Sequence, residues 1–88
     1  MISFNPQVKV TKRHMDELAK YVPVKEYGYP RKYWVSGREY KTRKSACDQM
    51  LHLFQNFVDN GIVPAAAIDE VLTATSSQYQ TPLFVVAS

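Results

Sequence analysis

The sequence predicts a single α+β domain over residues 1–88, with the element order β-α-β-β-α-α-β. Three observations favour this class. Apolar residues recur at helical spacing over residues 45–60, polar and apolar residues alternate on both sides of Gly37, and an uncharged run closes the chain at residues 83–86. We therefore expect a three- or four-stranded, mainly antiparallel sheet packed on a central amphipathic helix at residues 45–60.

The N-terminal segment predicts one short strand and one helix. Residues 2–10 alternate loosely around Pro6, which favours an edge strand. Thr11 can cap a helix that Pro23 stops. The first turn of this helix, residues 12–14, is basic, although the positive end of the helix dipole disfavours cations. This misplaced charge hints at a use outside the fold.

A hairpin follows an irregular connection. Residues 23–30 contain two prolines and a glycine and are predicted to form that connection. The hairpin turn lies either at Ser36–Gly37, which pairs Tyr33 with Tyr40, or one residue later. The later turn would pair Val35 with Tyr40 instead. Both registers predict the same faces, with Tyr33, Val35, Tyr40 and Thr42 on one side and Lys32, Trp34, Glu39 and Lys41 on the other.

Two helices are predicted in the second half of the chain. Thr42 or Ser45 caps the central helix, with Ser45 and Asp48 at the spacing of a capping-box variant, and Gly61 ends it. Pro64 suits the first position of a shorter helix. The broad apolar stripe of the longer helix makes it the expected centre of the core.

The C-terminal segment predicts a loop and a buried strand. Residues 75–81 are polar and form the loop, while residues 83–86 carry no charge, which favours a strand buried on both faces or at the centre of the sheet. The expected core consists of the inward apolar residues of all these elements: Met15, Leu18, Val22, Tyr33, Val35, Tyr40, Met50, Leu51, Phe54, Phe57, Val58, Ile68, Leu72, Phe84 and Val86.

Charge is distributed unevenly along the chain. Residues 1–44 hold all eleven Lys and Arg residues and four acidic residues, a net charge of +7. Residues 45–88 hold the other four acidic residues and no Lys or Arg, a net charge of −4. Such a chain can present a basic face to an anionic partner, or pair its two halves between copies of itself.

The expected location is cytoplasmic, without membrane association. Cys47 is the single cysteine, which suits a reducing compartment. The N-terminus has no apolar run of signal-peptide length, and no stretch is long and apolar enough to span a bilayer.

Residues that could carry out catalysis or bind a metal are few. Cys47 with His14 or His52 is the one conceivable catalytic set, and Cys47 falls on the apolar stripe of its helix, where a buried thiol is expected to fill space. Asp48 and His52 lie one helical turn apart but supply two metal ligands where three or four are needed. We expect no enzymatic activity, no metal and no cofactor.

The segment from Arg31 to Lys44 is the strongest candidate for a functional site. It contains six Lys or Arg residues and three aromatic residues. If the opposite face of the hairpin covers the core, Trp34 lies outward between Lys32 and Lys41, an arrangement that stacks a base while cations contact phosphates. A two-stranded ribbon also fits the major groove of DNA. The candidate nucleic-acid or partner-binding residues are Arg31, Lys32, Trp34, Arg38, Lys41, Arg43, Lys44, Tyr27 and Tyr29.

Two of these aromatic groups also have purely structural interpretations. The first helix could cover Trp34 and bury its indole under Met15 and Leu18, while the lysine stems extend outward. Tyr27 and Tyr29 could form a protein-binding loop or a lid over the sheet.

The run from Tyr33 to Met50 combines a strand, a glycine turn, a strand that ends in Tyr-x-Thr and a helix with an early alanine. This layout resembles the DNA-binding domains at the ends of phage integrases, which usually have three strands. The resemblance covers about a fifth of the chain and identifies no family.

These features predict a small basic, non-enzymatic accessory protein of the phage or mobile-element type that binds DNA or RNA through the hairpin at residues 31–44. The alternative is an inhibitor or adaptor that docks on an acidic surface of a host protein, which could itself be a nucleic-acid enzyme, with Tyr27, Tyr29 and Trp34 as anchors. A third possibility is a homo-oligomer joined through the helix at residues 65–72 or the final strand.

Overall fold

The order of helices and strands agrees with the predicted α+β class. The computed structural model describes residues 1–76 and 80–87, so the centre of the predicted loop, residues 77–79, lies outside the described residues. The elements within the described part are β1 (Ile2–Phe4), α1 (Lys12–Ala19), β2 (Lys25–Tyr27), β3 (Lys32–Val35), β4 (Arg38–Tyr40), α2 (Arg43–Asp59), α3 (Ala66–Thr73) and β5 (Phe84–Val86).

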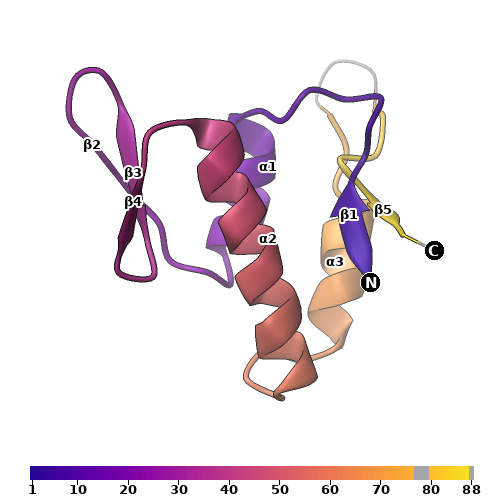
Figure 1. The fold of residues 1–88 in the computed structure, drawn as a ribbon. Helices are drawn as coiled ribbons and strands as arrows, with labels where there is room; N and C mark the ends of the chain where they lie inside the picture. Colours follow the sequence, from indigo (N-terminus) through magenta and orange to yellow (C-terminus); the bar gives the residue numbers. More distant parts are fainter. Residues whose placement is uncertain (77–79, 88) are drawn as a thin grey trace.

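Within residues 1–76 and 80–87 the strands form two separate antiparallel sheets, where the sequence predicted one. β2, β3 and β4 make a three-stranded sheet in that order, and β1 pairs with β5 in a second, two-stranded sheet. The three-stranded sheet lies on one side of α2, and α3 lies on the other side together with β1 and β5 (Figure 1). The two ends of the chain therefore pair with each other and leave one face of the three-stranded sheet uncovered.

Strand β2 corrects the prediction of an irregular connection at residues 23–30. Lys25 pairs with Trp34 and Tyr27 pairs with Lys32, so β2 extends the hairpin as an antiparallel edge strand. Its three residues carry too little apolar character to be recognised as a strand. Gly28, at φ 79°, then turns the chain back toward β3. The glycine that predicted irregular structure therefore lies in the turn between two strands.

The hairpin turn lies at Ser36–Gly37, and the alternative turn one residue later is wrong. Ser36 has φ 49° and Gly37 has φ 80°, the signs that a two-residue type I′ turn requires at both central positions. Tyr33 consequently pairs with Tyr40. This register fixes which hairpin side chains share each face.

The N-cap residues of α1 and α2 are ones that the sequence predicted. Thr11 is the N-cap of α1, as predicted. Thr42 is the N-cap of α2, and its Oγ1 accepts a hydrogen bond of 3.1 Å from the backbone N–H of Ser45. Ser45 is therefore inside the helix, and the capping-box variant with Asp48 is wrong. α2 begins at Arg43, so the basic pair that ends the hairpin segment lies in its first turn.

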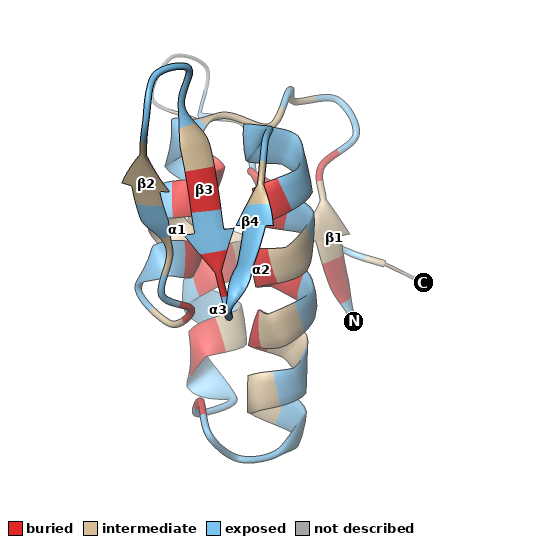
Figure 2. Ribbon diagram, turned by 60° about the vertical axis from the view of Figure 1, so that its left-hand side comes forward, coloured by how far each residue is buried: buried red, intermediate tan, exposed pale blue. Residues whose placement is uncertain are grey.

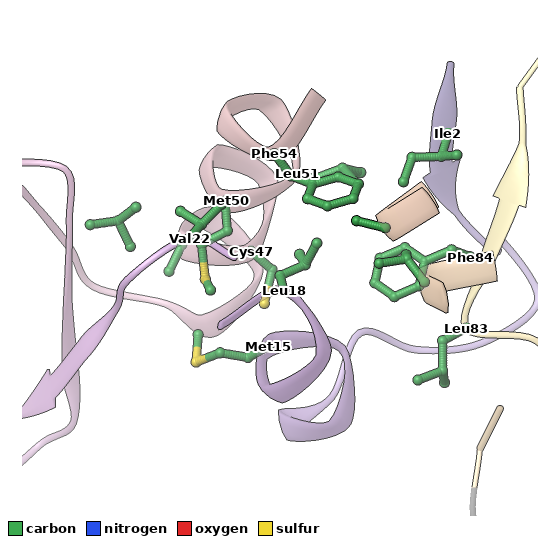
Figure 3. Close-up of a cluster of buried hydrophobic side chains, with 14 of the residues drawn as sticks. Ile2, Met15, Leu18, Val22, Cys47, Met50, Leu51, Phe54, Leu83 and Phe84 are labelled. Atoms are coloured by element: carbon green, nitrogen blue, oxygen red, sulfur yellow. The ribbon is translucent and has the colours of Figure 1, made fainter. Parts of the chain in front are cut away.

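The core lies between the three-stranded sheet, α1, α2, α3 and β5. Figure 3 shows Phe54 and Leu51 of α2 in the cluster that also contains Phe84 and Ile2. Of the predicted core, these residues are buried: Met15, Leu18, Val22, Tyr33, Val35, Met50, Leu51, Phe54 and Phe84. These pack against it while partly buried: Tyr40, Phe57, Val58, Ile68 and Leu72.

Val86 is the one wrong member of that prediction, because it is 68% exposed. Among the described residues β5 pairs only with β1, so it lies at the edge of the molecule instead of the centre of a sheet. The buried apolar residues absent from the predicted core are Ile2, Ala46, Cys47, Val63, Ala67, Val71 and Leu83.

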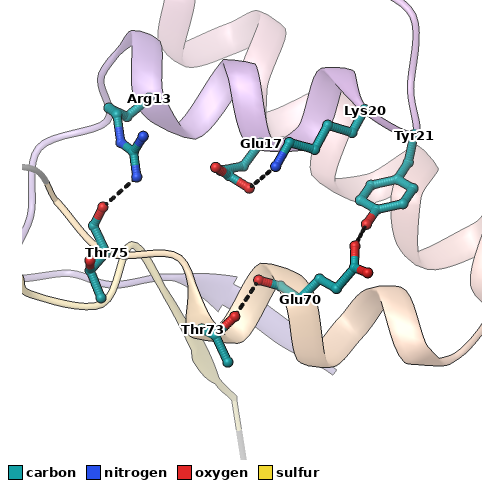
Figure 4. Close-up of polar contacts among 7 residues, drawn as sticks. All are labelled: Arg13, Glu17, Lys20, Tyr21, Glu70, Thr73 and Thr75. Carbon is teal, nitrogen blue, oxygen red and sulfur yellow. Dashed lines mark hydrogen bonds and ion pairs between the residues drawn. The ribbon is translucent and has the colours of Figure 1, made fainter.

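Polar contacts attach α1 to the C-terminal half (Figure 4). The Tyr21 hydroxyl donates to Glu70 of α3, and the Arg13 guanidinium donates to the backbone carbonyl of Thr75 at 2.7 Å. The bond to Glu70 raises the pKa of Tyr21 to about 12. Together with the packing of α1 on α2, these contacts hold the α1 segment on the core side of the three-stranded sheet (Figure 1).

Candidate nucleic-acid interface

Trp34 points out of the protein from the middle strand of the three-stranded sheet. Its neighbours Tyr33 and Val35 are 4% and 0% exposed and face the core, whereas Trp34 is 46% exposed. The alternation appears as successive buried and exposed bands along β3 (Figure 2). Burial of the indole under Met15 and Leu18 is therefore wrong, because both of these side chains are buried in the core on the other side of the sheet.

Strand register defines the surface around this tryptophan. Lys25 and Glu39 are the direct partners of Trp34 on β2 and β4, and Tyr27 is the partner of Lys32. Directly paired side chains lie on the same face of a sheet. We call these five residues the outer face: Lys25, Tyr27, Lys32, Trp34 and Glu39.

The outer face contains a shallow hollow of about 370 Å³ that is lined by Lys25, Tyr27 and Trp34. An aromatic ring on each of two neighbouring strands, with an ammonium group beside them, gives a platform on which a planar apolar group can lie. The hollow is open, so a ligand would contact it from one side, as a stacked base does.

Glu39 fixes the polar part of this face. The Tyr27 hydroxyl donates a hydrogen bond of 2.6 Å to Glu39 Oε1, and Lys32 Nζ lies 3.9 Å from the same oxygen. The hydrogen bond to Glu39 raises the pKa of the Tyr27 phenol. Glu39 therefore orients the Tyr27 ring, but it also places a negative charge on a surface that would bind phosphates.

The remaining predicted site residues separate into two groups. Arg38 lies beside the turn, at the opposite end of the hairpin from Lys32, with its Cζ atom 5.8 Å from the centroid of the Tyr40 ring. The other basic residues are at the end where β3 begins and β4 leads into α2 (Figure 1). That group consists of Arg31, Lys32, Lys41, Arg43 and Lys44.

Two of the predicted site residues, Lys44 and Tyr29, differ in how free their side chains are to contact a partner. Lys44 Nζ is 2.6 Å from Asp48 and lies over the ring of Phe4, so part of its charge is already neutralised. Tyr29 is fully exposed in the turn between β2 and β3, beyond the edge of the outer face. The lid interpretation of Tyr29 is therefore wrong, since a side chain that packs over the sheet would not be fully exposed.

Lys25 is a residue of the outer face that the sequence analysis did not include in the candidate site. It was assigned to the irregular connection, although the register places it directly beside Trp34. The alternation of Lys25, Glu26 and Tyr27 was the available signal, since it puts the first and third side chains on one face of a strand.

Cys47 is buried, and burial raises the pKa of its thiol to about 11, which disfavours the reactive thiolate. Within residues 1–76 and 80–87, no group of three His, Cys, Asp or Glu side chains could hold a metal ion. In the same part of the chain, none of the helices has the length and apolar character to cross a bilayer. Comparison of the chain with protein-family models, curated proteins and solved structures found no match.

Proposed function

We propose that this protein is a small, non-enzymatic nucleic-acid-binding protein that holds single-stranded DNA or RNA on its outer face. The outward position of Trp34 carries the proposal. A half-exposed indole on a sheet face, with Tyr27 on the neighbouring strand, offers two rings for stacking. Stacking on an aromatic residue contributes about 1–3 kcal/mol per base and tolerates any sequence.

Lysines around the rings supply the contacts to phosphate. The side chains of Lys25 and Lys41 are exposed and form no hydrogen bond or ion pair with another described residue. The ammonium group of Lys32 lies 3.9 Å from Glu39 and has no other ion pair in the described part of the chain. Since these ammonium groups form no close ion pair within the described part of the protein, they can replace the counterions of a nucleic-acid backbone.

The open aromatic platform favours a single strand over a duplex. Bases in a duplex are stacked on each other, so an aromatic ring reaches their faces only where they are unpaired. A sheet can instead enter the major groove, and β2 supplies the third strand of the integrase-like layout noted above. That mode would use the cations without the ring faces, and a comparison of the two substrates distinguishes them.

The test is a titration of the protein with a single-stranded oligonucleotide and with the matching duplex, monitored by the emission of its single tryptophan. We expect quenching by the single strand and a slope of log K against log salt of about −2, from three lysine contacts on a single strand. No salt-sensitive binding of either substrate at low ionic strength would refute the proposal. Tighter binding of the duplex would refute the stacking mode.

Tyr29 favours a second candidate function, binding of an acidic protein surface. A fully exposed tyrosine at the tip of the β2–β3 turn, next to Arg31, is typical of an interface anchor. A Tyr29→Ser variant distinguishes the candidates, since it should weaken a protein complex and leave nucleic-acid affinity unchanged. A homo-oligomer through α3 or β5 stays a prediction that light scattering would test.

A further inference from the structure

A second hollow lies behind the outer face, at the end of the molecule where α1 and α2 begin. It has a volume of about 400 Å³ and is lined by Lys12, Glu26, Arg31, Tyr33 and Arg43. We call it the basic hollow. The β2–β3 turn and the first turns of both helices lie at this same end (Figure 1), so three separate segments bring cations to one place.

The carboxylate in the basic hollow balances part of this charge. Glu26 Oε2 is 3.2 Å from Lys12 Nζ and 3.9 Å from Arg31 Nη1. Lys12 is also paired with Asp16, which lies outside the hollow. The guanidinium of Arg43 has no hydrogen bond or ion pair with any described residue, and neither does the hydroxyl of Tyr33. The hollow therefore holds one unpaired guanidinium, one loosely paired guanidinium and a free hydroxyl donor.

Helix geometry makes this concentration of cations costly without a ligand. Lys12 and Arg43 are the first residues of α1 and α2, and neither helix has an acidic residue in its first turn. The positive end of each helix dipole therefore adds to the positive side chains. An anion in the hollow would be attracted by both helix ends and by the side chains together.

From these observations we infer that the basic hollow binds the terminal phosphate of a nucleic-acid strand. Arg43 and Arg31 present guanidinium groups, whose paired N–H donors match two phosphate oxygens. The three-stranded sheet, α1 and α2 line the hollow, and its guanidinium groups attract a terminal phosphate more strongly than a backbone phosphate, because the terminal group carries a second negative charge. Tyr33 supplies a further donor from the wall.

The inference extends the proposed function by adding an end-specific contact, and it depends on that function for the identity of the ligand. The outer face and the basic hollow lie on the two sides of β2, whose successive residues Lys25, Glu26 and Tyr27 point alternately to one and the other. Because β2 is an edge strand, a nucleic-acid strand can pass around it and contact both sides.

The experiment compares oligonucleotides of one sequence that carry a 5′-phosphate, a 3′-phosphate or no terminal phosphate. We expect one phosphorylated form to bind about tenfold more tightly than the unphosphorylated strand, because charge-assisted contacts to a doubly charged group are added. An Arg43→Gln variant should lose this preference. The matched control is Arg38→Gln, which removes the same charge at the far end of the hairpin and should retain the preference.

Three outcomes test the terminal-phosphate site and separate it from the proposed function. Equal affinity for all three strands in the wild-type protein overturns the inference and leaves the proposed function standing. If no oligonucleotide binds, but inorganic phosphate shifts the NMR signals of Arg43 and not those of Arg38, the basic hollow binds phosphate and the proposed function is wrong. If Arg43→Gln keeps the full preference, the terminal phosphate binds elsewhere and the inference is wrong.

Discussion

Removal of the Glu39 charge should strengthen nucleic-acid binding. Glu39 is the direct β4 partner of Trp34, and its carboxylate accepts the hydrogen bond from Tyr27. A phosphate of the nucleotide whose base stacks on Trp34 would therefore lie close to a negative charge. In a Glu39→Gln variant the amide oxygen can still accept the bond from Tyr27, so the ring geometry is retained while the repulsion is lost.

The size of the effect follows from the geometry of paired strands. Side chains directly opposite each other start about 5 Å apart, which places the phosphate roughly 7 Å from the carboxylate. Two unit charges at roughly 7 Å repel each other by about 0.6 kcal/mol in a medium as polar as water. Affinity should therefore rise about threefold at low salt, and the gain should shrink near 0.15 M salt, where the Debye length is about 8 Å.

Fluorescence anisotropy of a labelled single strand at low and at physiological salt measures both quantities. The control is Asp69→Asn on α3, which removes a negative charge on the other side of α2 from the sheet and should change affinity little. A loss of affinity in Glu39→Gln would show that the carboxylate contacts the partner directly. That result would contradict the predicted repulsion between the Glu39 carboxylate and the phosphate of the stacked nucleotide.

Three further predictions concern stability and reactivity. Burial lowers the pKa of His14 below 6.5, and its Nδ1 accepts the Thr11 N–H at 3.0 Å. The unfolded chain thus binds more protons, so the free energy of unfolding should be constant above about pH 6.5 and fall below it by at most about 1.4 kcal/mol per pH unit. Urea unfolding between pH 7.5 and 5.5 measures this, and His14→Gln should flatten the profile while His52→Gln should not. Cys47 should react with a thiol reagent when urea unfolds the protein and stay unreactive in the folded state, whereas rapid labelling without urea would contradict its burial. Ser36→Asn should raise the thermal midpoint by stabilising the positive φ of the hairpin turn by a few tenths of a kcal/mol, and an unchanged or lower midpoint would argue against the type I′ geometry.

Much of the fold could be predicted because local signals coincided with long-range packing. The apolar stripe on α2 and the N-cap at Thr42 predict the same helix, and Gly37 readily adopts the positive φ that its turn requires. The pairing of β1 with β5 could not be predicted, because nothing in two short apolar runs says which partner each will choose. Val86 was misassigned for the same reason, since the burial of a strand depends on the sheet it joins.

The candidate site was predicted in part. The outward position of Trp34 could be predicted from the alternation along β3. The aliphatic Val35 was expected to face the core, so its neighbour Trp34 had to lie on the opposite face. The register of β2 was needed to find Lys25, and the spatial meeting of two helix starts was needed to find the basic hollow. Lys12 and Arg43 are far apart in the sequence, so their proximity depends on tertiary structure alone.

Contact between a base and the outer face is the central claim, and photochemical cross-linking measures it most directly. A single-stranded oligonucleotide with a 5-bromouracil base, irradiated in complex with the protein, should cross-link to the peptide that contains Trp34, with a minor product at Tyr27. Mass spectrometry of the digested complex identifies the site. Cross-links confined to β1, β5 or α3 would contradict the claim, because the base would then lie on the opposite side of the molecule.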